Sequence, residues 1–237
     1  GWSINRFRSN TQLAFISNVN NIKRQGFSFG DYLSFMGGMG AIMGAGRSIS
    51  TGGVQIGNNL SDGFSETLAL GFNASHDFGS KTEIRSSYFL SSIDNNQVRT
   101  TQQQQVLGSS LSALTQQNTS QKSDNLSHRM RLNAKHEFQK GNELQLRSNF
   151  SLSTSSLSNI GARESTSLEG IVQNNATTSY ITDGDQTSGD ASLSWRKRLT
   201  ENGLSLVADA RMNLNDSDTK ADLASLTGIA GDGNVLT

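Results

Sequence analysis

Three segments of the chain share one pattern of apolar and polar positions. Each has an alternating run, a tight polar turn and a second alternating run. The segments are Thr67 to Ile93, Ser127 to Ser153 and Ala191 to Leu214, with turns at Gly79-Ser80, Lys140-Gly141 and Asn202-Gly203. Alternation with a period of two is typical of β-strands, and a short turn containing Gly between two such runs predicts a β-hairpin. The sequence therefore predicts three hairpins that recur about every 60 residues.

Each predicted strand has one apolar and one polar face. In the second hairpin Met130 and Leu132 fall on one face, whereas Arg131 falls on the other. Two folds produce this pattern. One is an antiparallel sheet that covers a core with its apolar face, and the other is a membrane barrel with lipid outside and water inside.

The lengths of the predicted connections favour the barrel. The three turns are short, whereas the segments 94–126 and 154–189 are predicted as long loops, which compact soluble domains rarely contain. Short turns at the periplasmic end and long extracellular loops are typical of outer-membrane barrels. The predicted fold is an all-β, antiparallel, up-and-down transmembrane barrel, of which residues 1–237 form a partial arc. Its seven strands are expected near 4–19, 64–78, 81–98, 125–138, 142–158, 178–198 and 203–217.

Composition agrees with a wall of paired strands and a thin core. Only 33% of the residues are hydrophobic, and the mean hydropathy is −0.46. The chain has no proline, which sheets exclude from their interior, and no cysteine, which rules out disulfides and thiolate metal sites. Because 20 basic residues balance 20 acidic ones, no basic surface for nucleic acid is predicted.

No apolar stretch of the sequence is long enough for a transmembrane helix, and no signal peptide opens the chain. We therefore expect the chain to be a piece of a longer protein, with the targeting signal upstream. Since seven strands cannot close an even-numbered barrel, residues outside the chain are expected to complete it.

Aromatic and histidine side chains end the strands that precede the short turns. They are His76, Phe78, His136, Phe138 and Trp195, all on the apolar parity. Amphipathic rings concentrate where a bilayer meets water, which predicts a girdle at the lipid interface. The alternative is that they are ordinary aromatic residues at strand ends.

The opposite parity carries charge. Its predicted lumen-facing residues are Glu83, Arg85, Arg129, Arg131, Lys135, Arg147, Arg196, Arg198, Asp209 and Arg211. Such a surface can select solutes in a water-filled lumen. The favoured interpretation is that these side chains form cross-strand pairs that stabilise the wall.

Two segments are weaker candidates for binding. The apolar, Gly-rich segment around Phe35, Met36, Met39, Ile42 and Met43 could contact a partner, although packing on the barrel's own rim is the favoured interpretation. Asp183, Asp185 and Asp190 are a weak calcium candidate in a predicted loop that lacks the final Glu of a calcium-binding loop. No motif predicts catalysis or a cofactor, so the chain is not expected to be an enzyme.

Five short passages, spread over most of the chain, fit one known family. They are Asn5-Arg6-Phe7-Arg8, Gln25 to Tyr32, Leu60 to Phe64, His76 to Glu83 and Trp195 to Arg198. They resemble the barrel part of large Bacteroidetes-type outer-membrane proteins related to TonB-dependent receptors. The resemblance implies integral location in the outer membrane of a Gram-negative bacterium and a barrel with more strands than this chain supplies.

Three functions remain open from the sequence. The first is a barrel for solute uptake or ligand recognition at the cell surface, with lipid and energy-coupling proteins as its partners. The second is a scaffolding barrel in a multi-protein outer-membrane complex. The third is a soluble β-protein, which would remain in solution without detergent.

Overall fold

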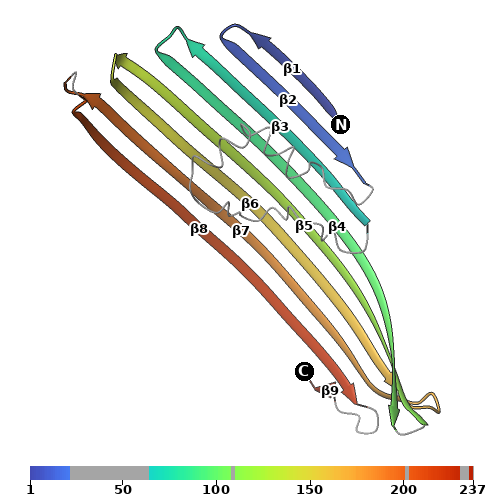
Figure 1. Cartoon of the computed structure of the whole chain (residues 1–237). Helices are drawn as coiled ribbons and strands as arrows, with labels where there is room; N and C mark the ends of the chain where they lie inside the picture. The colour runs from blue at the N-terminus through green and yellow to red at the C-terminus, as the bar shows by residue number, and fades with distance from the viewer. Residues whose placement is uncertain (22–63, 108–109, 201–202, 230–234, 237) are drawn as a thin grey trace.

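The structure is a computed structural model that describes residues 1–21, 64–107, 110–200, 203–229 and 235–236. All regular elements among these residues are β-strands. They are β1 (Trp2–Arg8), β2 (Thr11–Asn20), β3 (Phe64–Phe78), β4 (Thr82–Leu107), β5 (Ser110–Gln139), β6 (Asn142–Thr166), β7 (Val172–Arg198), β8 (Ser205–Ile229) and β9 (Val235–Leu236). They form one antiparallel sheet in sequence order, a single curved layer (Figure 1). The expected all-β antiparallel class is therefore confirmed.

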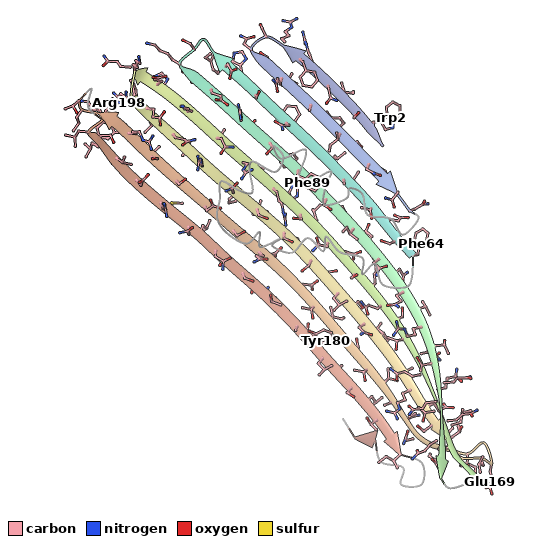
Figure 2. The ribbon with its side chains drawn as sticks, in the orientation of Figure 1. Trp2, Phe64, Phe89, Glu169, Tyr180 and Arg198 are labelled. Atoms are coloured by element: carbon pink, nitrogen blue, oxygen red, sulfur yellow. The ribbon has the colours of Figure 1, made fainter. Side chains whose placement is uncertain are left out.

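Four hairpin turns lie along one end of the sheet, which we call the turn end (Figure 1). They join β1 to β2, β3 to β4, β5 to β6 and β7 to β8. Gly79 and Gly141 have φ of 66° and 79° in two of these turns, a conformation that residues with a Cβ rarely adopt. Arg198 lies at the turn end and Glu169 at the opposite, far end (Figure 2).

Gly141 also lacks room for a side chain, since an added Cβ would lie 2.9 Å from the Cβ of Arg198. We expect Gly141→Ala to lower the free energy of unfolding by about 2 kcal/mol, because of the left-handed backbone and this contact. Denaturant unfolding measures the change. Gly161→Ala is the control, since Gly161 has no positive φ and no atom within 4 Å of an added Cβ. Equal stability of the two variants would contradict this account of the turn.

The N-terminal region differs from the prediction. The segment 4–19, expected to be one strand, forms the hairpin of β1 and β2, with its turn at Ser9 and Asn10. A single strand would place the odd-numbered residues Phe7 and Leu13 on one face, whereas in the hairpin they lie on opposite faces. The polar run from Arg8 to Thr11 can turn because Asn tolerates turn conformations without glycine.

The predicted long loops were also wrong. Most of 94–126 and 154–189 continues the strands, so that β4 to β8 are 25 to 30 residues long. These segments are rich in Ser, Thr, Asn and Gln, and hydropathy gave no sign of a strand. A strand with a partner on each side satisfies its backbone hydrogen bonds whatever its side chains are. Eight strands of 7 to 30 residues and the two-residue β9 replace the seven strands that were expected.

The described strands form an open sheet, with β1 and β9 at the ends of the order. They enclose almost no hydrophobic core. Among the described residues, Ala69 and Phe89 are the only buried hydrophobic side chains, at 2% and 5% exposure. Many large apolar side chains are exposed instead, including Phe72 and Met130. Whatever covers them is not another layer of this sheet.

Candidate functional site: an apolar belt across one face

The strand register assigns the residues of β1 to β8 to two faces, because residues directly opposite each other point to the same side. Face 1 carries the row Leu70, Leu90, His128 and Leu152. Face 2 carries the row Arg85, Asn133 and Arg147. The parity predicted for the hairpins is thus maintained across the sheet.

On face 1 an apolar belt crosses β2 to β8. It starts near the turns and contains no Asp, Glu, Lys or Arg. Its members include Leu13 and Phe15, Leu68 to Ala74, Ile84 to Leu90, Leu126 to Ala134, Leu144 to Leu152, Gly189 to Trp195 and Leu206 to Leu214, counting alternate residues. Soluble monomers rarely expose a continuous apolar patch larger than about a few hundred Å². A belt across seven strands is typical of a surface that contacts a protein partner or a membrane.

The far boundary of the belt runs roughly parallel to the line of hairpin turns. The first charged face-1 residues beyond it are Glu66, Asp94, Asp124, Asp185 and Asp216, in β3, β4, β5, β7 and β8. These five residues lie 11 to 15 residues from the turn ends of their strands. In β6 the first charged residue on face 1 is Glu164, 22 residues from the turn end, although the belt on this strand also ends at Leu152. The hydrogen-bonded rows do not follow this boundary, since the row that starts at Leu68 inside the belt ends at Asp218 outside it.

The turns and the belt run obliquely to the rows because the hairpins are staggered. The strands β2, β4 and β6 begin at Thr11, Thr82 and Asn142. These first residues pair with β3, β5 and β7, at positions one to three residues before the end of each of those strands. About two residues of stagger over two strands corresponds to a strand tilt of roughly 35° from the perpendicular to the line of turns. A span of about 12 residues at this tilt is about 30 Å high, the thickness of a bilayer's hydrocarbon core.

The rings predicted as a girdle all lie on face 1 near the turn end. His76 and His136 each share a hydrogen bond of 2.7 Å between Nδ1 and a threonine hydroxyl, from Thr11 and Thr82 respectively. The indole of Trp195 donates to Asn142 Oδ1 at 2.9 Å. The two histidines also contact Phe78 and Phe138 edge-to-face, with ring centroids 4.2 and 4.5 Å apart. The structure thus gives the rings one level and one repeated hydrogen-bonding arrangement.

Farther from the turns, and still inside the belt, Tyr88 and His128 form a similar polar pair. The Tyr88 hydroxyl and His128 Nδ1 are 2.8 Å apart. The sequence analysis missed this pair, and also the hydroxyl and amide partners of the turn-end rings. The one signal in the sequence for the partners of the turn-end rings was the polar residue that begins β2, β4, β6 and β8 after each turn.

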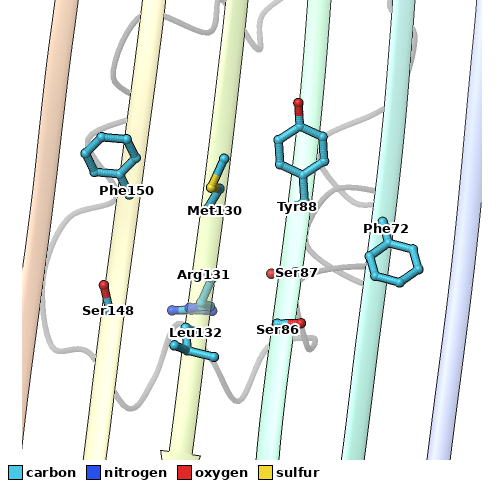
Figure 3. A pocket seen from close by; sticks show the side chains of 9 residues that line it. All are labelled: Phe72, Ser86, Ser87, Tyr88, Met130, Arg131, Leu132, Ser148 and Phe150. Atoms are coloured by element: carbon cyan, nitrogen blue, oxygen red, sulfur yellow. The ribbon is translucent and has the colours of Figure 1, made fainter.

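A shallow depression of about 390 Å³ lies inside the belt (Figure 3). The short side chains of Ser86 and Ser148 leave the space, and the rings of Phe72, Tyr88 and Phe150 flank it. The depression is open and its lining is mainly apolar, so it is a local hollow of the belt.

All ten predicted lumen-facing residues lie on face 2. Two of them, Arg131 and Lys135, have partners on the neighbouring strand. Lys135 forms an ion pair with Glu143 at 3.2 Å, and Arg85 forms one with Glu83 on its own strand. Arg131 Nε donates to Asn149 Oδ1 at 3.0 Å, and Asn149 Nδ2 donates to the Asp190 carboxylate. Whether this face lines a lumen remains a prediction.

The three carboxylates of the weak calcium candidate do not converge on one site. Asp183, Asp185 and Asp190 lie in β7 and not in a loop, and Asp190 points to face 2 whereas the other two point to face 1. The part of the chain that the structure describes contains no group of three potential ligands suited to a metal ion. The predicted contact segment with Phe35, Met36, Met39, Ile42 and Met43 lies outside the described residues.

Beyond the belt, Glu66, Asp94 and Asp124 lie side by side on face 1 of β3, β4 and β5. Burial raises the pKa of the Asp94 carboxyl above its ordinary value, and the hydrogen bond with Asp124 and the charges of Asp124 and Glu66 raise it further. Lys122 opposes this effect through its own charge and pairs with Asp124 at 3.6 Å. The residues beyond the belt therefore form a charged surface.

No protein-family model matches the chain, and no curated protein matches it either. Within the described residues, no helix is both long and apolar enough to cross a membrane.

Proposed function

We propose that this chain is part of the wall of an outer-membrane β-barrel of the TonB-dependent-receptor type, which recognises or takes up a solute without covalent chemistry. Face 1 would contact lipid, and face 2 would line a polar lumen. The hairpin turns would lie at the periplasmic end, and the polar far halves of β4 to β8 would stand outside the bilayer. Further strands of the same protein would pair with the free edges of the sheet.

The observation that carries the proposal is the apolar belt of constant height. Its boundary follows the turns and cuts across the hydrogen-bonded rows. A flat bilayer crossing tilted strands imposes this relation, because the hydrocarbon layer fixes the height at which charge becomes tolerable on every strand. The scarcity of buried apolar side chains supports the same reading.

The cross-strand pairs of face 2 favour a second candidate, a scaffolding barrel in a multi-protein outer-membrane complex. Charges that satisfy one another, as Lys135 and Glu143 do, stabilise a wall without leaving groups free for a solute. The two candidates share the same membrane placement. Measuring solute flux through vesicles that contain the full-length protein separates them, since a scaffold would give none.

Single cysteines test the membrane placement, because the native chain has no cysteine to remove. We expect a water-soluble thiol reagent to label Gln145→Cys and Asn149→Cys on face 2 and to spare Leu146→Cys and Phe150→Cys on face 1. Beyond the belt, Ser158→Cys on face 1 and Asn159→Cys on face 2 should both react. The full-length protein in native membranes is the sample. Equal labelling of the two faces within the belt would rule out the proposed placement.

A further inference from the structure

Among the described residues, every charged side chain that points to face 1 at the turn end is basic. Arg6 and Arg8 in β1 and Lys197 in β7 point to this face, next to His76 and His136. Lys81 and Lys140 lie exposed in the β3–β4 and β5–β6 turns. No Asp or Glu of the described strands points to face 1 between the turns and the far boundary of the belt. We call these five basic residues and two histidines the turn-side rim.

The acidic residues at this level lie on face 2, and two of them have ion-pair partners there. They are Asp77, Glu83, Glu137 and Glu143. Glu83 pairs with Arg85, and Glu143 with Lys135. Among the described residues, none of the five basic side chains of the turn-side rim forms an ion pair with a carboxylate. The positive charge of the rim is therefore not neutralised within the described sheet.

The two histidines extend this surface. Each uses Nδ1 for the threonine hydroxyl at 2.7 Å, which leaves Nε2 for a second partner. When the threonine donates to Nδ1, the neutral ring carries its proton on Nε2 and can donate it. A hydrogen-bond acceptor with negative charge would suit both the rings and the rim.

Beyond the belt, face 1 has the opposite sign. Nine acidic residues point there, against two basic ones, Lys122 and Lys220. The acidic residues are Glu66, Asp94, Asp124, Glu164, Asp183, Asp185, Asp216, Asp218 and Asp222. At this height the described face 2 has Arg99 and Arg163 and no acidic residue. The two edges of the apolar belt thus carry charges of opposite sign.

We propose that the turn-side rim binds the phosphates of anionic phospholipid head groups. This inference rests on the proposed function, because the rim borders the belt assigned to lipid. Charge complementarity selects this partner, since unpaired Arg and Lys at the edge of an apolar surface attract anionic head groups. The acidic far edge would repel the same head groups. The rim and the acidic edge together fix which leaflet each end of the sheet meets.

Lipid selectivity tests the proposal in the full-length protein. The rim variant combines Arg8→Gln, Lys81→Gln, Lys140→Gln and Lys197→Gln. The control variant combines Arg99→Gln, Lys122→Gln, Arg163→Gln and Lys220→Gln, which removes the same charge beyond the belt. Native mass spectrometry in detergent with equal phosphatidylglycerol and phosphatidylcholine gives the ratio of bound lipids. We expect the native protein and the control to prefer phosphatidylglycerol by about fivefold or more, and the rim variant to lose this preference.

Equal lipid preference in the rim variant and the control would overturn the proposal. If the fourfold rim variant does not fold, the single exposed turn variants Lys81→Gln and Lys140→Gln are compared with Arg99→Gln in the same assay. Insertion into vesicles of phosphatidylcholine alone is measured separately. Insertion without anionic preference would refute the rim and leave the barrel standing, whereas absence of insertion would refute the barrel itself.

Discussion

Replacing Leu132 with arginine is expected to lower the free energy of unfolding in a bilayer by about 2 to 4 kcal/mol. Leu132 points to face 1 of β5 in the middle of the apolar belt, where it borders the shallow depression. A guanidinium there loses its water without gaining a partner, because the belt contains no acidic side chain. Reversible denaturant unfolding of the full-length protein in vesicles measures the loss.

Two substitutions on the same strand serve as controls for Leu132→Arg. Asn133→Arg places the charge at the same height on face 2, beside Arg85 and Arg147. Ser120→Arg places it on face 1 beyond the belt, where the side chain is exposed. Ser120→Arg should change the free energy of unfolding by less than about 0.5 kcal/mol, as ordinary surface substitutions do. Asn133→Arg should lower it by up to about 1 kcal/mol, because like charges directly opposite each other in a sheet repel. If Leu132→Arg were no worse than Asn133→Arg, face 1 would not contact lipid.

The side of the sheet that each residue faces could be predicted from the sequence. Successive side chains of a strand point to opposite faces, so Leu146 and Arg147 could be assigned to different faces without knowledge of the neighbouring strands. The turns at Gly79 and Gly141 were equally predictable, since glycine supplies the positive φ that such turns use. Local rules were sufficient wherever the relevant interaction lies within one hairpin.

The ends of the strands were not predictable by the same rules. Apolar alternation stops where the belt stops, although β5 continues to Ser110 and β6 to Thr166. Beyond that point both faces are polar, and the hydrogen bonds of neighbouring strands hold the sheet together. Hydropathy reports what surrounds a strand and not whether the strand exists.

The partners of the rings required the register between hairpins. Thr11 and His76 are 65 residues apart, and Thr82 and His136 are 54 apart. Nothing local fixes how two hairpins slide relative to each other, and a shift of two residues would keep every face while breaking every such pair. The girdle could therefore be predicted as a set of rings, whereas its hydrogen bonds could not.

Replacing Ser120 with proline separates the extended-strand structure from the predicted loop. Ser120 lies in β5 between Val98 of β4 and Ile160 of β6, inside the segment 94–126. Proline removes the backbone N–H and its ring disturbs the pairing, which in a central strand costs about 3 kcal/mol or more. We expect a loss of this size, or local opening of β4 to β6 beyond the belt with loss of amide protection at Val98 and Ile160.

Ser120→Arg is the matched control, because it changes the same side chain and keeps the N–H. Leu168→Pro is the second control, since Leu168 lies in the β6–β7 turn and its N–H makes no backbone hydrogen bond in the described structure. Both should leave amide protection in β4 to β6 unchanged. In a loop, proline at Ser120 would be as harmless as arginine. Unaltered amide protection in Ser120→Pro would therefore support the predicted long loop. The strands would then be paired only within the height of the belt.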